Sequence, residues 1–193
     1  MISHKHRCIF VHIPKCGGQS VESCFMRDYG IPNRNSRECF DKLNIDPWMK
    51  DTPKEMLTSH WLLSEYPKLD YFKFAIIRNP IDRAISYFQW FSKKYAGYSF
   101  EEFCKTALST KNKWEFMMIR PQVDYLEGGV DKILRLGEHA PFFKEKYGFT
   151  IRHINKSKKR EIKLTDESID IISKKYKKDF KLWRDTGDNT LTT

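Results

Sequence analysis

The sequence predicts an α/β fold, a single domain over residues 1–193 in which helices flank a mainly parallel sheet. Two apolar runs, at 8–13 and 72–77, are each followed by a proline-containing turn and then by helical spacing. A third apolar run, at 129–136, follows a Gly-Gly turn. Strands that alternate with helices join a sheet in the same direction, so these units predict parallel pairing. We expect the core to span about 7–184, followed by a short tail.

Composition sets the class of protein. Hydrophobic residues make up 40% and aromatic residues 15% of the 193 residues, which is typical of a globular domain. The formal net charge of +10 favours anionic partners without choosing among them. The five cysteines are odd in number and contain no C-x-x-C pair, which argues against a metal site and a disulfide framework. No stretch has the length of a membrane span or of a signal peptide, so we expect a soluble, cytoplasmic protein.

The first element, CIFVHIPKCGGQSVESCF at 8–25, predicts a buried strand, a glycine turn and the start of a helix. Pro14 ends the strand because it cannot donate to a sheet ladder. Gly17 and Gly18 permit a tight turn and keep side chains away from a ligand. Helical spacing begins at Ser20. Such a unit directs backbone N–H groups and the positive end of a helix at one point, which predicts a phosphate or sulfate site.

This turn differs from the nucleotide-triphosphate P-loop. That motif, G-x-x-x-x-G-K-[ST], places its lysine directly after the second glycine. Here Lys15 precedes the glycine pair, and the turn is shorter.

The second element, YFKFAIIRNPIDRAISYFQWF at 71–91, predicts another buried strand that ends at Arg78 and a helix that begins near Pro80. Asp82 falls in the first turn of that helix, where a carboxylate suits the helix dipole.

Together the two elements resemble the sulfotransferases that use 3′-phosphoadenosine 5′-phosphosulfate (PAPS). PKCGGQS resembles their 5′-phosphosulfate loop, and RNPIDRAISYF resembles their 3′-phosphate motif. The second resemblance implies that Arg78 and Ser86 bind the 3′-phosphate, because an arginine offers a fixed fork of donors to a phosphate and Ser86 adds a hydroxyl about two turns further on. The order Pro-Lys-x-Gly-Gly-x-Ser is similar to the family-2, carbohydrate-type branch, which includes the heparan and dermatan 2-O-sulfotransferases and bacterial relatives. The resemblance implies a P-loop-like sulfotransferase fold, PAPS as co-substrate and no metal. Relatives usually carry Thr or Ser in place of Gln19, which leaves the geometry of the loop open.

The resemblance also implies a late loop that closes over the nucleotide, within HINKSKK at 153–159. A basic surface loop is the alternative for this stretch. The residues expected to bind the cofactor are Lys15, Cys16, Gly17, Gly18, Gln19, Ser20, Arg78, Ser86, Asn155, Lys156 and Ser157.

His60 is the candidate base. It lies in LTSHW at 57–61. The resembled family has a histidine in the corresponding short segment, and that histidine takes the proton of the acceptor hydroxyl. Imidazole titrates near neutral pH and is suited to that role. The alternative is a core histidine packed against Trp61. Lys15 and His60 are therefore the two predicted catalytic residues.

Further along the chain, helices are predicted at 99–108, at 141–147 and from Thr165 to 184. Trp114 and Phe116 are interpreted as core, with an acceptor-lining role as the alternative. Gln122 and Tyr125 have counterparts in the family without an assigned role.

The sequence therefore predicts an enzyme that moves the sulfuryl group from PAPS to an acceptor hydroxyl by in-line transfer. Lys15 would stabilise the leaving phosphate and His60 would accept the proton. The resemblance favours a carbohydrate acceptor, on a glycan or glycolipid. The alternatives are an ATP-dependent small-molecule kinase and a non-catalytic basic binding module for anionic polymers. No nucleic acid is expected, because no nucleic-acid motif is recognised.

Overall fold

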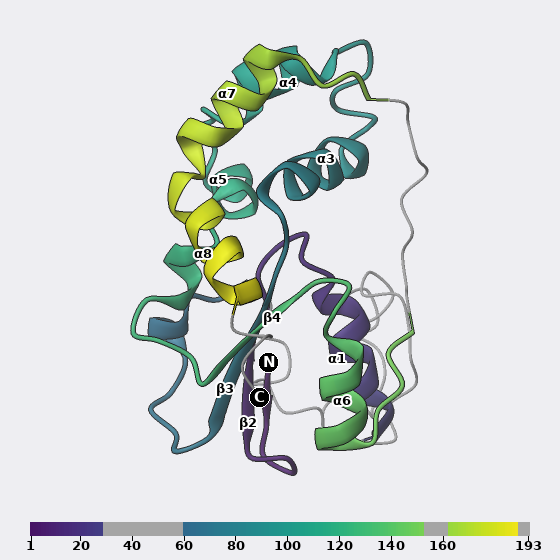
Figure 1. The fold of residues 1–193 in the computed structure, drawn as a ribbon, viewed down its shortest axis with the longest axis vertical. Helices are drawn as coiled ribbons and strands as arrows, with labels where there is room; N and C mark the ends of the chain where they lie inside the picture. The colour runs from purple at the N-terminus through teal and green to yellow at the C-terminus, as the bar shows by residue number, and fades with distance from the viewer. Residues whose placement is uncertain (29–59, 153–161, 189–193) are drawn as a thin grey trace, which may run out of the picture.

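A four-stranded sheet forms the centre of the computed structural model, which describes residues 1–28, 60–152 and 162–188 (Figure 1). Its strands, in the spatial order β1-β2-β3-β4, are β1 (Ile2–Ser3), β2 (Cys8–Val11), β3 (Phe72–Ile77) and β4 (Lys132–Arg135). β2, β3 and β4 are parallel, and β1 pairs antiparallel at the edge. The predicted α/β fold with a mainly parallel sheet is confirmed.

Helices and short 3-10 turns make up most of the rest. In chain order they are α1 (Gly18–Asp28), η3 (Leu63–Glu65), α3 (Pro80–Trp90), α4 (Phe100–Ala107), α5 (Lys113–Ile119), η4 (Val123–Leu126), α6 (Ala140–Tyr147), α7 (Asp166–Lys175) and α8 (Lys177–Asp188). In the part of the chain that is described, no helix is both long and apolar enough to cross a membrane.

The two faces of the sheet are covered by different helices. On one face, α1 and α6 lie side by side, and their Phe25 and Phe143 pack with Phe10 and Phe74 of the strands (Figure 1). On the other face, residues of η4 and α8 pack against alternate strand residues such as Val11. Burial on both faces explains why the strands read as nearly continuous apolar runs.

A third cluster joins α3, α4, α5 and α7 beyond the end of the sheet (Figure 1). Phe103 of α4 and Ile172 of α7 are fully buried there. This helical group extends from the end of the sheet at which β2 and β3 finish, which is the end that carries both predicted anion turns.

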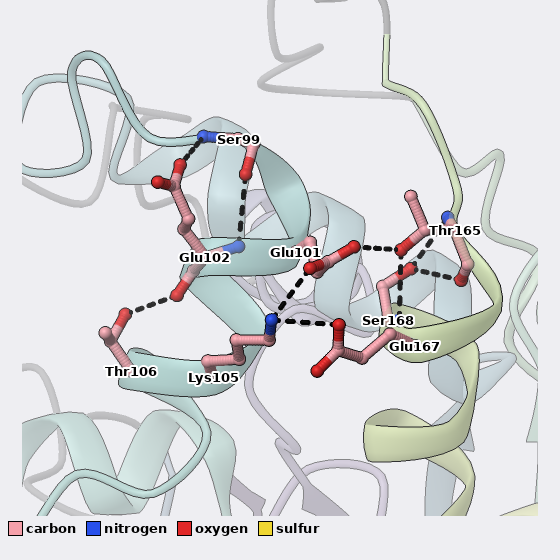
Figure 2. Close-up of polar contacts among 8 residues, drawn as sticks. All are labelled: Ser99, Glu101, Glu102, Lys105, Thr106, Thr165, Glu167 and Ser168. Atoms are coloured by element: carbon pink, nitrogen blue, oxygen red, sulfur yellow. Dashed lines mark hydrogen bonds and ion pairs between the residues drawn. The ribbon is translucent and has the colours of Figure 1, made fainter.

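Figure 2 shows how the first turns of α4 and α7 are tied together. Ser99 and Glu102 form a reciprocal capping box at the start of α4. The hydroxyl of Thr165, the N-cap of α7, donates to Glu101 at 2.7 Å. Lys105 bridges Glu101 at 2.8 Å and Glu167 at 2.9 Å. These exposed contacts align the two helices and add little stability individually.

Two expectations are corrected. The single helix predicted from Thr165 to 184 is two helices, because the backbone leaves helical geometry at Tyr176, with φ −108° and ψ 28°. Trp114 and Phe116, interpreted as core, are 51% and 43% exposed. Their α5 neighbours Met118 and Ile119 supply the buried face instead.

Candidate active site

The turn between β2 and α1 is shaped by its two glycines. Gly17 has a positive φ of 79°, and a Cβ there would lie 2.7 Å from Cδ1 of Leu136. A Cβ on Gly18 would overlap the imidazole of His12. Gly18 is also the first residue of α1, so the helix begins at the turn. Both glycines are therefore required, one by backbone conformation and the other by close packing.

His12 is buried behind this turn. Its Nδ1 lies 2.8 Å from Oε1 of Glu22, which comes from the second turn of α1. The pair joins the end of β2 to the helix on the far side of the glycines. Sequence reasoning gave His12 little weight; the visible signal was a polar residue inside an apolar strand run.

Lys15 has a left-handed backbone, with φ 66°, and a partly exposed side chain. Its Nζ lies 3.9 Å from the ring centroid of Trp90, at the last position of α3. The pKa of Lys15 is lowered to about 7, first because burial removes water from the ammonium and second because Arg78 is close. Within the described ranges, no carboxylate lies at ion-pair distance from this ammonium.

Arg78 and Ser86 come from the turn after β3 and from α3. Asn79 caps that helix, its side chain accepting from Ile81 N at 3.0 Å, and Pro80 occupies the first turn. The Arg78 guanidinium donates from Nη1 to the carbonyl oxygen of Lys15 at 3.3 Å. The side chains of Arg78 and Ser86 are both partly exposed. The structure thus brings the two predicted anion turns into direct contact.

Arg83 is a residue whose role sequence reasoning missed, although it lies inside the RNPIDR motif. It is buried, and its guanidinium donates to three carbonyl oxygens: Pro14 at 3.0 Å, Arg120 at 2.9 Å and Met118 at 3.1 Å. Pro14 belongs to the β2–α1 turn, and the other two lie at the end of α5. Arg83 therefore holds the β2–α1 turn against the end of α5, and its guanidinium is not directed at a ligand.

His60 lies beside the same turn. Its ring centroid is 4.7 Å from that of His12, with the planes at 64°. Its pKa is lowered to about 3, mainly by burial and next by the neighbouring His12, so the imidazole is neutral at pH 7. Trp61, the neighbour named in the alternative, is 41% exposed and its ring contacts that of Tyr66.

The remaining predicted cofactor residues differ in their surroundings. The Cys16 side chain is buried, its thiol directed at Gln122 Oε1 (3.2 Å), and its backbone N–H donates to Ile13 at 3.4 Å. Burial raises the pKa of Cys16 to about 11, so it stays a thiol. Gln19 is partly exposed and Ser20 is buried in the first turn of α1. Asn155, Lys156 and Ser157 lie outside the described residues.

Comparison with known proteins places this geometry in a family. A family model described as "Sulfotransferase family" matches residues 1–127, which include both anion turns. The chain belongs to the sulfotransferase family. This confirms the predicted family and enzyme class.

A plant relative adds a narrower likeness. Over 90 residues the chain is 28% identical to a protein described as "Protein-tyrosine sulfotransferase" from Arabidopsis thaliana. That match covers 46% of this chain and 18% of the relative, so the chain spans only a small part of the relative's length. No solved structure gave a significant match.

Proposed function

We propose that this member of the sulfotransferase family transfers the sulfuryl group from PAPS to an acceptor hydroxyl. The observation that carries the proposal is the contact between the two anion turns, where Arg78 bonds the carbonyl of Lys15 at 3.3 Å. β2 and β3 are adjacent and parallel, so both turns lie at the carboxyl ends of the strands, where α/β proteins bind ligands. A nucleotide with phosphate groups at both its 3′ and 5′ positions fits two neighbouring cationic turns.

The residues present fit PAPS in their donor chemistry. Lys15 and the start of α1 suit the 5′-phosphosulfate, because an ammonium and a helix N-terminus both favour an anion. Arg78 and Ser86 suit the 3′-phosphate, since they offer a guanidinium fork and a hydroxyl from one turn and its helix. PAPS supplies an activated sulfuryl group, and these side chains set its orientation.

Lys15 stabilises the negative charge that grows on the leaving phosphate oxygen as its bond to sulfur breaks. In the structure its ammonium lies 3.9 Å from the ring centroid of Trp90. An adjacent anion favours the charged form and raises the lowered pKa of Lys15. We expect Lys15→Ala to lower turnover by roughly two orders of magnitude or more.

His60 accepts the acceptor's hydroxyl proton while the acceptor oxygen forms its bond to sulfur. The imidazole is already neutral, which is the form a base needs. Its low pKa makes it a weak base in the resting protein. Negative charge brought in beside it raises that pKa toward the working range.

The acceptor that we propose is a carbohydrate hydroxyl, and a tyrosine hydroxyl is the second candidate. The carbohydrate follows from the likeness of PKCGGQS to the family-2 loop. The tyrosine follows from the name of the plant relative. Trp61 and Trp90, next to His60 and beside Lys15, expose 41% and 49% of their surfaces, and flat aromatic faces suit either a sugar or a phenol ring. Parallel sulfation assays on glycan and tyrosine-peptide acceptors separate the two.

Calorimetric titration without metal tests the cofactor. We expect 3′-phosphoadenosine 5′-phosphate, the product nucleotide, to bind much more tightly than AMP, and Arg78→Ala to remove most of that preference. Arg7→Ala is the matched control, because Arg7 also donates to a backbone carbonyl, that of Asp70 at 3.3 Å, but lies at the opposite end of β2. In a second titration with Mg²⁺ added, tighter binding of ATP than of the bisphosphate would favour the kinase instead. Absence of any nucleotide binding would favour the binding module.

A further inference from the structure

Gln122, the residue just before η4, is fully buried, with 0% of its surface exposed. Its side-chain Oε1 accepts from the backbone N–H of Arg78 at 2.8 Å and from the thiol of Cys16 at 3.2 Å. Its Nε2 donates to the backbone carbonyl of Arg78 at 2.9 Å. One amide thus bonds both polar backbone groups of Arg78 and a side chain of the β2–α1 turn.

The position of Gln122 is itself fixed from a third element. Its backbone N–H donates to Asp179 Oδ2 at 2.8 Å, and that of Val123 donates to Oδ1 at 3.1 Å. Asp179 is fully buried in α8. The backbone at Gln122 is therefore held by Asp179, and the side-chain amide of Gln122 bonds to the two anion turns.

This arrangement bears on ligand binding more than on packing. Arg78 is the first residue after β3, so its backbone lies just beyond the end of the strand. The Gln122 amide bonds both the N–H and the carbonyl of Arg78, and this fixes the backbone from which the Arg78 side chain extends. Cys16 precedes the glycine pair, so the same amide also sets the distance between the two turns.

We propose that Gln122 is a positioning residue of the cofactor site, whose amide holds the Arg78 backbone and the Cys16 thiol at a fixed separation. This inference rests on the proposed function, because it assumes a ligand with phosphate groups at both turns. A side-chain amide is suited to the task, since it presents one acceptor and one donor in a plane and matches the N–H and C=O of a single residue.

The test compares nucleotide preference in Gln122→Met and Gln122→Asn with that of the wild type. The methionine keeps the volume and loses all three bonds. The asparagine keeps a neutral amide that is one methylene too short to reach all three partners. The readout is the ratio of Kd for AMP to Kd for 3′-phosphoadenosine 5′-phosphate, measured by calorimetry without metal. A loss of stability alone lowers the amount of folded protein and leaves this ratio unchanged.

We expect the ratio to fall roughly tenfold in Gln122→Met and less in Gln122→Asn, as for loss of bonds to a buried group. Tyr125→Phe is the control, because it removes a part-buried hydrogen bond from the tyrosine hydroxyl to the carbonyl of Met117 in α5 and leaves the bonds of Gln122 to Arg78 and Cys16 in place. Its ratio should match the wild type. If Gln122→Met does not fold, Gln122→Asn decides: a ratio below that of the wild type supports the proposal, and an unchanged ratio overturns it.

The outcomes separate the two claims. A wild type that shows no preference for the bisphosphate overturns the proposed function and this inference with it. A wild type with the preference, and Gln122 variants that retain it within about twofold, overturn the inference and leave the proposed function standing.

Discussion

Ligand binding beside Lys15 should draw a proton from solution at alkaline pH. With the pKa of Lys15 lowered to about 7, about nine-tenths of these side chains are neutral at pH 8 and about one-tenth at pH 6. A phosphate next to the amine restores its pKa toward the ordinary value. We therefore expect net uptake of most of one proton per bound 3′-phosphoadenosine 5′-phosphate at pH 8, where the nucleotide phosphates are already ionised. At pH 6 the uptake should vanish or reverse, because Lys15 is already charged and the phosphates release protons on binding.

Calorimetry in two buffers of different ionisation enthalpy measures this uptake directly. Lys15→Met should abolish it at pH 8. Lys146→Met is the matched control, because that ammonium also rests on an aromatic ring, 4.0 Å from the centroid of Phe72, yet belongs to α6. Binding without proton uptake at pH 8, or equal uptake in Lys15→Met, would refute this reasoning.

Three further predictions concern stability. Asp179→Ala should lower the free energy of unfolding in urea by roughly 2–5 kcal/mol, because two buried N–H groups lose their acceptor; an unchanged midpoint and slope would contradict this. Gly18→Ala should cost about 1–3 kcal/mol by overpacking against His12, and a His12→Ala background should reduce that cost. Between about pH 6.5 and pH 3, His60 binds a proton in the unfolded chain but not in the folded protein, so the free energy of unfolding falls as pH falls. The urea midpoint should therefore drop less between pH 7 and pH 5 in His60→Gln, and parallel drops would count against the lowered pKa.

The sheet and the two anion turns could be predicted because their signals are local. A buried strand, a proline or glycine break and helical spacing occur within about 20 residues of chain at β2–α1 and again at β3–α3. Each signal reflects a backbone constraint that acts wherever the segment lies. The caps at Ser99 and Thr165 were predictable for the same reason.

The contacts that assemble the site could not be predicted in this way. Gln122 meets Arg78 across 44 positions of sequence, and Asp179 meets Gln122 across 57. The sequence around each of these residues contains no local pattern that predicts its distant partner. The exposure of Trp114 has a similar cause, because apolar residues on a short helix look alike in sequence until the packing of α5 selects one face.

The break between α7 and α8 at Tyr176 also depends on long-range contacts and could not be predicted from local sequence. Apolar spacing continues across it, from Ile172 to Phe180, so the sequence predicts one helix. Tertiary bonds favour the break, since the Tyr176 hydroxyl donates to the buried carbonyl of Ile119 at 2.7 Å. The same change of direction lets α8 place Asp179 beneath Gln122.

A crystal structure with 3′-phosphoadenosine 5′-phosphate bound is the most direct test of the central claim, that two adjacent turns of one sheet edge hold the two ends of this nucleotide. The account predicts the 5′-phosphate at the β2–α1 turn, within hydrogen-bond distance of Lys15 Nζ, and the 3′-phosphate on Arg78 and Ser86. A nucleotide bound elsewhere, or bound in the reverse direction with its 3′-phosphate on Lys15, would contradict it.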